Sequence, residues 1–293
     1  MTLFAAMNRS HGWILLVLVL PLFAFVSDLE IYRLYRGKKE TSAEKMMKAI
    51  EEADVVFFGE LHNNAVCHFF EMEVLKSLHK AHGSNLVVGC EMFESDDQLA
   101  VDEYLAGMTN DAKFEENARV WPNYKTDYKA IVQYAKKEKI PFIATNVPRR
   151  YASLVFQKGF EGLDGLSAEA KSYIAPLPIL YDTTVACYNN LLHSNMGGHM
   201  SANMPKAQAL KDATMAHFIL KNLKEGKKFY HFNGAYHSNN HEGIVWYLKQ
   251  AKPDLKITVI STAEQADLSK PDSASQNLGD YLLLVNENFP KTH

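Results

Sequence analysis

The sequence predicts an α/β protein with a mostly parallel central sheet and helices on both faces of that sheet. Short, continuously apolar runs rich in β-branched and aromatic residues recur along the chain, as in strands buried on both faces. Stretches with helical spacing of apolar residues lie between most of these runs, and such alternation favours a parallel sheet. Glycines and prolines interrupt the alternation around residues 159–205, where we expect an irregular helical and loop insertion.

The composition excludes several classes of protein. Of 293 residues, 47% are hydrophobic and 22% are charged, which is typical of a globular chain rather than a disordered or fibrous one. The formal net charge of −3 gives no global positive field, which argues against a dedicated nucleic-acid binder. The three cysteines lack CxxC and metal-finger spacing, so we expect buried thiols rather than a disulfide framework.

Residues 1–27 are predicted to be a signal peptide or an N-terminal anchor. Arg9 precedes a charge-free apolar run over residues 13–26, which is too short to span a roughly 30 Å hydrocarbon core comfortably. A buried core helix is the alternative. The first cysteine is Cys67, far beyond the apolar run, so there is no lipobox cysteine for lipid anchoring. We therefore expect an exported protein in the periplasm or associated with the cell envelope.

The remaining elements follow in chain order. Residues 28–45 are expected to form a linker or an N-terminal helix, and residues 46–293 the α/β domain. The predicted strands cover residues 54–59, 85–91, 140–146, 228–234, 256–261 and 281–285. The predicted helices cover residues 65–82, 127–139 and 205–225, and polar loops are expected at 193–205 and 267–279.

Acidic and imidazole side chains stand at the ends of three predicted strands. Glu60 and His62 end the first strand, Glu91 ends the second, and His237 follows the fourth. Ligands of open parallel sheets bind beyond the C-terminal strand ends, so these four residues should converge in one crevice. They suit a divalent cation such as manganese, cobalt, zinc or iron, or a general base with its orienting partner. Alternatively, Glu60 and His62 cap the next helix, and Glu91 pairs with Arg149.

His237 and His241 are four residues apart, but we expect only His237 to reach the crevice. Asn239 and Glu242 have the spacing of a helix start, with Asn239 as N-cap and Glu242 as its reciprocal partner. In this interpretation His237 precedes the helix, and His241 lies in its first turn on the surface.

Further polar residues are candidates for ligand binding. Gln208 and Asp212 share one face of the predicted 205–225 helix, where they either reach the crevice or form a solvated stripe. Asn146 and Arg149 end or follow the third predicted strand, at the same rim.

Two irregular segments carry residue types that ligate haem iron. His199 lies in a loop with Met200, and Tyr181 lies in the insertion. A solvated loop histidine is the alternative for His199. The GxGxxG, P-loop, GxSxG and HExxH motifs do not occur in the chain.

Six sequence blocks, taken in order, match one known family. They are Phe58–Asn63, Glu91–Phe93, Trp121–Tyr124 with Asp127 and Tyr128, Ala144–Arg149, Ala207–Ala216 and Gly234–His237. With these blocks the chain resembles the ChaN-like haem-binding uptake proteins of the Tiki superfamily, from about residue 46 to residue 284. No single block is decisive, but six in the same order are highly specific.

The resemblance implies an exported haem-binding protein of a haem or iron uptake system, with haem as its cofactor. It also implies an outer-membrane haem receptor and a second copy of the chain as candidate partners, and no nucleic acid. The family members are often lipoproteins, and the missing lipobox cysteine departs from that pattern. The candidate cofactor-binding residues are Asn146, Arg149, Tyr181, His199, Met200, Gln208 and Asp212.

The wider superfamily includes erythromycin esterase-like hydrolases and Tiki metalloproteases, which use paired G-x-x-H motifs and an acidic residue. The matching positions here are Gly59 with His62, Gly234 with His237, and Glu91. We expect a haem-binding protein rather than an enzyme. The alternative is a metal-dependent hydrolase in which a divalent ion and the Glu60, His62, Glu91 and His237 cluster act at the crevice. A binding module for another small ligand is the third hypothesis.

Overall fold

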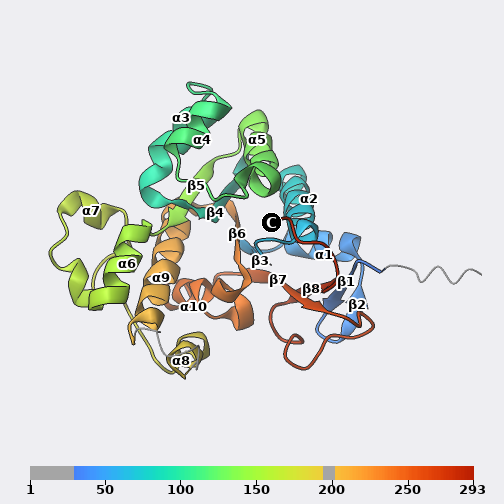
Figure 1. Ribbon diagram of the computed structural model, residues 1–293. Helices are drawn as coiled ribbons and strands as arrows, with labels where there is room; N and C mark the ends of the chain where they lie inside the picture. Colours follow the sequence, from blue (N-terminus) through green and yellow to red (C-terminus); the bar gives the residue numbers. More distant parts are fainter. Residues whose placement is uncertain (1–29, 194–201) are drawn as a thin grey trace, which may run out of the picture.

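The computed structural model describes residues 30–193 and 202–293. One eight-stranded sheet runs through them in the order β2-β1-β8-β7-β3-β6-β4-β5 (Figure 1). Its strands are β1 (Tyr32–Arg36), β2 (Lys39–Thr41), β3 (Val55–Glu60), β4 (Leu86–Glu94), β5 (Phe142–Asn146), β6 (Lys228–Gly234), β7 (Ile257–Gln265) and β8 (Tyr281–Asn286). Neighbouring strands from β8 to β5 are parallel, and β1 and β2 pair antiparallel at one edge. The predicted α/β class with a mostly parallel sheet is confirmed.

All six predicted strands are present as β3 to β8, and two edge strands were not predicted. Residues 28–45, expected to be a linker or a helix, contain β1, β2 and the start of the first helix. The expectation failed because both strands are short, β1 mixes apolar with charged residues and β2 is wholly polar, so neither has the apolar run that marks the central strands. β4 also continues to Glu94, with a register shift after Cys90.

Helices cover both faces of the sheet. They are α1 (Ala43–Ile50), α2 (Ala65–His82), α3 (Gln98–Leu105), α4 (Asp111–Asn117), α5 (Lys129–Glu138), α6 (Arg149–Lys158), α7 (Ala168–Ser172), α8 (Ala186–His193), α9 (Met204–Asn222) and α10 (Ile244–Ala251). Val56 and Phe58 of β3 point to the core under α1 to α5, whereas Val55 and Phe57 point to the core under α9 and α10. This alternation follows from the two-residue period of a strand.

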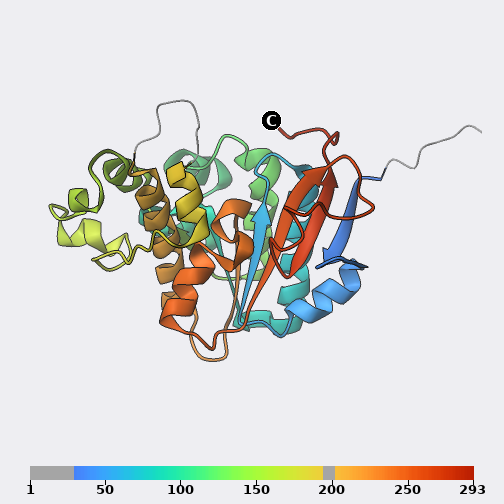
Figure 2. The ribbon, with the colours of Figure 1, turned by 90° about the horizontal axis from the view of Figure 1, so that it is seen from below.

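The insertion around residues 159–205 is irregular, as predicted. It contains a short helix at Phe160–Leu163, then α7 and α8, and it packs on α6 and α9 through Leu163, Ile174 and Ile179. Figure 2 shows this insertion at one end of the molecule and the β1–β2 edge at the other.

Two predicted segments fall wholly or partly outside the described residues. Residues 1–27, the predicted signal peptide or anchor, lie outside them, as do His199 and Met200 of the predicted loop. Across 30–193 and 202–293, the helices lack the combination of length and apolarity that crossing a membrane requires.

Candidate functional site

The four predicted crevice residues meet at the C-terminal ends of β3, β4 and β6. Glu60 of β3 lies in register with Gly234 of β6. Glu91 Oε2 accepts a hydrogen bond of 2.9 Å from the Gly234 amide, and its Oε1 lies 3.1 Å from His237 Nε2. His62 Nδ1 lies 2.6 Å from Glu60 Oε1. The structure therefore brings all four side chains together at one rim, two as a Glu60–His62 pair and two as a Glu91–His237 pair.

Gly234 separates the two pairs and has to be small. A Cβ at this position would lie 2.7 Å from His62 Nε2 and 3.4 Å from Glu91 Oε2. The His62 side chain is 44% exposed, and its ring meets Trp121 edge to face at 4.7 Å. His62 is thus the solvent-facing member of the site, with its Nε2 directed at the strand end.

His237 is held between two carboxylates. Its Nδ1 lies 2.5 Å from Asp212 Oδ1 on α9, and its Nε2 contacts Glu91. Tyr188 OH donates to Asp212 Oδ2 at 2.8 Å, and Gln208 Nε2 lies 3.0 Å from His237 Nδ1. Burial alone would lower the pKa of His237, but the charges of Glu91 and Asp212 raise it to about 9. His237 is therefore a buried cation at neutral pH, with both ring nitrogens engaged.

The pKa of Glu91 is shifted in the opposite direction from that of His237. Burial would raise the pKa of this carboxyl, but His237, followed by Lys211 and His62, holds it well below the usual range. Gln208 and Asp212 are both buried and reach the site from one face of α9, so the alternative of a solvated stripe is wrong.

Glu60 belongs to a second, deeper group. Its Oε1 accepts a hydrogen bond of 2.5 Å from Tyr128 OH. Burial, reinforced by the nearby Glu71, raises the pKa of Glu60 to about 8. Burial likewise raises the pKa of Glu71 to about 7. His68 Nδ1 lies 2.9 Å from Glu71 Oε2. A buried acidic pair thus lies directly beneath the exposed imidazole of His62.

The alternative roles for these residues are wrong. Asn64, not Glu60 or His62, caps α2, because its side chain accepts from the amides of Val66 and Cys67. Arg149 binds Glu94 at 2.6 Å rather than Glu91.

The helix predicted to start at Asn239 begins instead at Ile244. Asn240 adopts a left-handed φ of 58°, which ends the short turn before it can continue as a helix. His241 lies on the surface, as expected, and its Nε2 is 2.9 Å from Asp280 Oδ2.

A cleft of about 280 Å³ opens beside Glu91. Asn146 lies on its wall and donates to the Glu91 carbonyl at 2.9 Å. Two cationic side chains, Arg149 and Lys211, line the cleft together with Trp121. Glu91 and Glu94 also line this small hollow, and Arg149 pairs with Glu94, so among the described residues Lys211 is the lining cation without a carboxylate partner of its own in the cleft wall.

Tyr181 lies elsewhere, in the insertion. Its ring contacts Phe160 at 5.7 Å and Tyr188 at 5.8 Å between centroids. It therefore packs behind the residue that orients Asp212 and does not line the cleft beside Glu91.

Residues 46–248, more than half of the chain, match the family described as haem-binding uptake, Tiki superfamily, ChaN. The chain belongs to this ChaN family. No curated protein matches it in sequence.

Among solved structures, the ChaN fold of Campylobacter jejuni, described with cofacial haem binding, is similar at a TM-score of 0.67 and 18% identity. That likeness covers 88% of this chain and 98% of the other. Erythromycin esterase EreC is similar at a TM-score of 0.46 and 11% identity, over 83% of this chain and 78% of that one. The effector domain RRSP of a Vibrio vulnificus MARTX toxin is similar at a TM-score of 0.46 and 17% identity. That likeness covers 86% of this chain and 41% of the other. These likenesses concern the fold alone.

Several residues of this ChaN-family site were not predicted from the sequence. His68 and Glu71 stand three apart on α2, among the apolar positions that bury this helix. The spacing places them on one face, and two ionisable residues on a buried face are the signal that could have found them. Tyr188 and Lys211 left no comparable signal.

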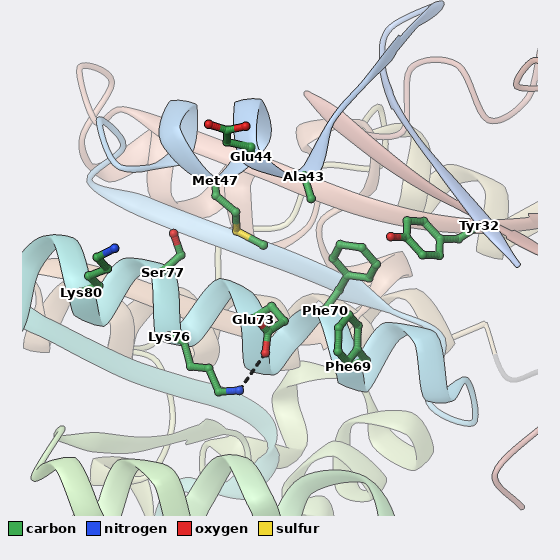
Figure 3. Close-up of a pocket in the computed structure, with 10 residues that line it drawn as sticks. All are labelled: Tyr32, Ala43, Glu44, Met47, Phe69, Phe70, Glu73, Lys76, Ser77 and Lys80. Carbon is green, nitrogen blue, oxygen red and sulfur yellow. Dashed lines mark hydrogen bonds and ion pairs between the residues drawn. The ribbon is translucent and has the colours of Figure 1, made fainter.

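A second hollow lies on the α1–α2 side of the sheet (Figure 3). It encloses about 410 Å³ between β1, α1 and α2. Tyr32, Phe69 and Phe70 form its aromatic part, and Lys76 and Glu73 form an ion pair of 2.8 Å at its edge. Like the cleft beside Glu91, it combines apolar side chains with charged ones, here Glu44 and Lys80 in addition to the ion pair.

Proposed function

We propose that this ChaN-family protein is exported and binds haem for a haem uptake system. Membership of the haem-binding family is the observation that carries the proposal. The predicted export segment over residues 1–27 supports the uptake role. An outer-membrane haem receptor would then deliver or accept the haem.

The residues around α8 fit a porphyrin. Leu180 and Leu192 are large apolar side chains that are 54% and 40% exposed. A hollow of about 430 Å³ is lined by apolar residues that include Phe160 and Ile179, and by Glu161 and Asp164. Tyr181, a side chain of a type that ligates haem iron, does not line this hollow but contacts the ring of Phe160. Apolar surface and an axial-ligand type therefore occur together, and the predicted ligands His199 and Met200 follow α8 in the chain.

The crevice fits haem less well. Its cleft of about 280 Å³ is below the roughly 300–1,000 Å³ of pockets for drug-sized ligands. His62 Nε2, the nitrogen that an iron would need, faces Gly234 at close range. The haem is therefore proposed to bind at the α8 side, away from His62.

A hemin titration of the purified full chain, followed by its absorption spectrum, tests the proposal. We expect a shifted Soret band in the wild type and in His62→Ala, and an altered band in His199→Ala and Tyr181→Phe. His241→Ala is the matched control, because His241 lies on the surface beside Asp280. No spectral change in the wild type would refute haem binding, and loss of the band in His62→Ala alone would place the haem in the crevice.

Export is tested separately. A reporter enzyme that is active only in the cytoplasm, fused after Lys45, should show little activity. Strong activity would contradict export. A second copy of this chain is a further proposed partner, and size-exclusion chromatography with hemin should then show a dimer.

A hydrolytic crevice is the second candidate function. The observation that favours it is the Glu60–His62 pair at 2.6 Å, an imidazole oriented by a carboxylate beside a cleft lined by Arg149 and Lys211. Burial would lower the pKa of His62, but Glu60 outweighs that effect and raises it. His62 would act as the base, and Lys211 would hold an anionic group, since Arg149 already pairs with Glu94.

The metal-dependent form of this candidate has one obstacle. A single ion bound by Glu60, His62, Glu91 and His237 would require His237 to lose a proton that two carboxylates stabilise. Hydrolysis of chromogenic esters, with and without Mn²⁺ or Zn²⁺, tests the candidate. Activity that His62→Gln abolishes while hemin binding persists would support it, and activity unchanged in His62→Gln would refute it.

A further inference from the structure

The group beneath the crevice has the composition and spacing of a metal site. Glu60 at the end of β3 and His68 and Glu71 on α2 each offer a ligand atom, and these atoms lie within 4.8 Å of one another. The three residues are 2%, 7% and 0% exposed. Across residues 30–193 and 202–293, this is the group of ionisable side chains that comes close enough to share an ion.

Within the described part of the chain, two oxygens in this group have no donor other than the neighbouring carboxyl, because Glu60 and Glu71 hydrogen-bond each other when one of them carries a proton. They are Glu60 Oε2 and Glu71 Oε1, and both are buried. Buried carboxylate oxygens are almost always satisfied by donors, water or a metal, because an unsatisfied one loses its hydration without compensation. A proton shared between the two carboxyls satisfies these oxygens, and a divalent cation in the place of that proton would satisfy both groups as carboxylates.

The surrounding hydrogen bonds turn one oxygen of Glu60 and one nitrogen of His68 towards Glu71, and a bound ion would replace the hydrogen bond between His68 and Glu71. Glu60 Oε1 is engaged by Tyr128 OH at 2.5 Å and by His62 Nδ1 at 2.6 Å, so its Oε2 remains. His68 Nε2 lies 3.2 Å from the His62 carbonyl, an acceptor, so Nε2 carries a hydrogen. His68 Nδ1 then faces Glu71 Oε2 at 2.9 Å and Glu60 Oε2 at 3.7 Å. Such outer hydrogen bonds orient the ligands of protein metal sites.

We propose that Glu60, His68 and Glu71 bind one divalent transition-metal ion, of the manganese or zinc class. Two carboxylates and one imidazole suit these ions. Ligand atoms of a tetrahedral ion with bonds of about 2.1 Å lie roughly 3.4 Å apart, so side-chain movements of about an ångström would close the site around the ion.

This ion site is distinct from the crevice set predicted from the sequence. It shares Glu60 with that set but uses two α2 side chains in place of Glu91 and His237. His237 is unsuited because carboxylates occupy both of its nitrogens. An ion on Glu60 Oε2 would lie one carboxylate away from His62, and it would fix the orientation of that carboxylate. The inference does not depend on haem binding.

Metal binding by the purified full chain tests the proposal in the absence of hemin. After treatment with a chelator, the protein is titrated with Mn²⁺, Zn²⁺ and Co²⁺, and bound metal is measured by mass spectrometry of the washed protein. We expect one ion per chain, a higher Tm with the ion, and a visible Co²⁺ spectrum. Less than about 0.2 ion per chain for all three metals would overturn the proposal.

Variants on α2 locate the ion. Glu71→Gln keeps the shape of the side chain and should weaken the Kd at least tenfold, and His68→Gln should do the same. The matched controls are Glu73→Gln and His79→Gln on the same helix, which should bind as the wild type does. Glu73 pairs with Lys76, and His79 with Tyr134, outside the cluster.

Folding is followed by circular dichroism and by the apo Tm. Loss of the metal-dependent rise in Tm in a folded Glu71→Gln protein supports the site. Unchanged affinity in Glu71→Gln, or loss of the ion in His237→Gln with Glu71→Gln unaffected, overturns it. If Glu71→Gln does not fold, the Co²⁺ spectrum of His68→Gln decides in the same way.

Discussion

Replacing Asp212 with asparagine tests the electrostatics of the crevice. Asp212 is 1% exposed, and its Oδ1 lies 2.5 Å from His237 Nδ1. The asparagine side chain would keep the hydrogen bond from Tyr188 but remove one of the two charges that hold His237 protonated. The pKa of His237 is about 9 against about 6.5 for an unperturbed histidine, a difference of roughly 3 kcal/mol in favour of the cation.

Glu91 and Asp212 together stabilise the His237 cation, so the loss of one of them should remove only part of that stabilisation. Since Glu91 remains, Asp212→Asn should cost about 1–3 kcal/mol of unfolding free energy at pH 6, less than the 3–5 kcal/mol for leaving a buried charge without any partner. For a domain of this size that corresponds to roughly 2–12 °C in Tm. The exposed Asp254 provides the control, and Asp254→Asn should change stability by no more than about 0.5 kcal/mol.

The pH dependence of the unfolding free energy tests the role of Asp212 more strictly than the size of the loss at one pH. A folded pKa above the unfolded one stabilises the protein fully below about pH 6.5 and loses that effect as the pH rises through about 9. The gap between wild type and Asp212→Asn should therefore be widest near pH 6 and narrow towards pH 10, as measured by urea denaturation. NMR of histidine-labelled protein should show a lower pKa for His237. A gap that is constant with pH, or an unchanged His237 titration, would refute the reasoning.

Two further changes test the site and the core. Gly234→Ala places a methyl group 2.7 Å from His62 Nε2. The substitution should cost about 1–3 kcal/mol of unfolding free energy and turn the His62 ring outward. An unchanged NMR titration of His62 would contradict this prediction. Phe114→Ala removes a core ring that is 1% exposed and should cost about 3–5 kcal/mol, whereas Leu99→Ala, at a site 71% exposed, should cost no more than about 0.5 kcal/mol. Equal losses in denaturation would contradict that reasoning.

The central fold could be predicted because burial on both faces leaves a simple pattern. β3 reads as an unbroken apolar run and is buried along its whole length. β2 is exposed or half-buried throughout and consists of polar residues, so nothing in its composition separates it from a loop. The periodic spacing of α2 gave both of its ends correctly, because Asn64 and Gly83 supply the start and stop conformations.

The position of the site could be predicted from the sequence, but which side chains contact each other within it could not. Parallel strands expose their carboxyl ends at one rim, which brought Glu60, Glu91 and His237 together from distant parts of the chain. Which atoms face each other depends on the rotation of α9 and α2 about their axes. That rotation turned Asp212 onto His237, and His68 onto Glu71, and it is decided by packing along the whole of each helix.

The cost of the crevice argues that it has a role of its own. Burying ionisable groups is unfavourable unless they are paired, and apolar residues of similar volume would stabilise the sheet as well or better. Here Asp212, Glu91 and His237 are all at least 95% buried, and Glu60 and Glu71 lie close beneath them. Haem at the apolar surface around α8 would not need any of these groups. Perturbed, buried ionisable groups gather where proteins bind ions or move protons. Haem binding and crevice chemistry should therefore be separable by mutation, with Tyr181 and His199 variants affecting hemin alone and His68 and Glu71 variants affecting the ion alone.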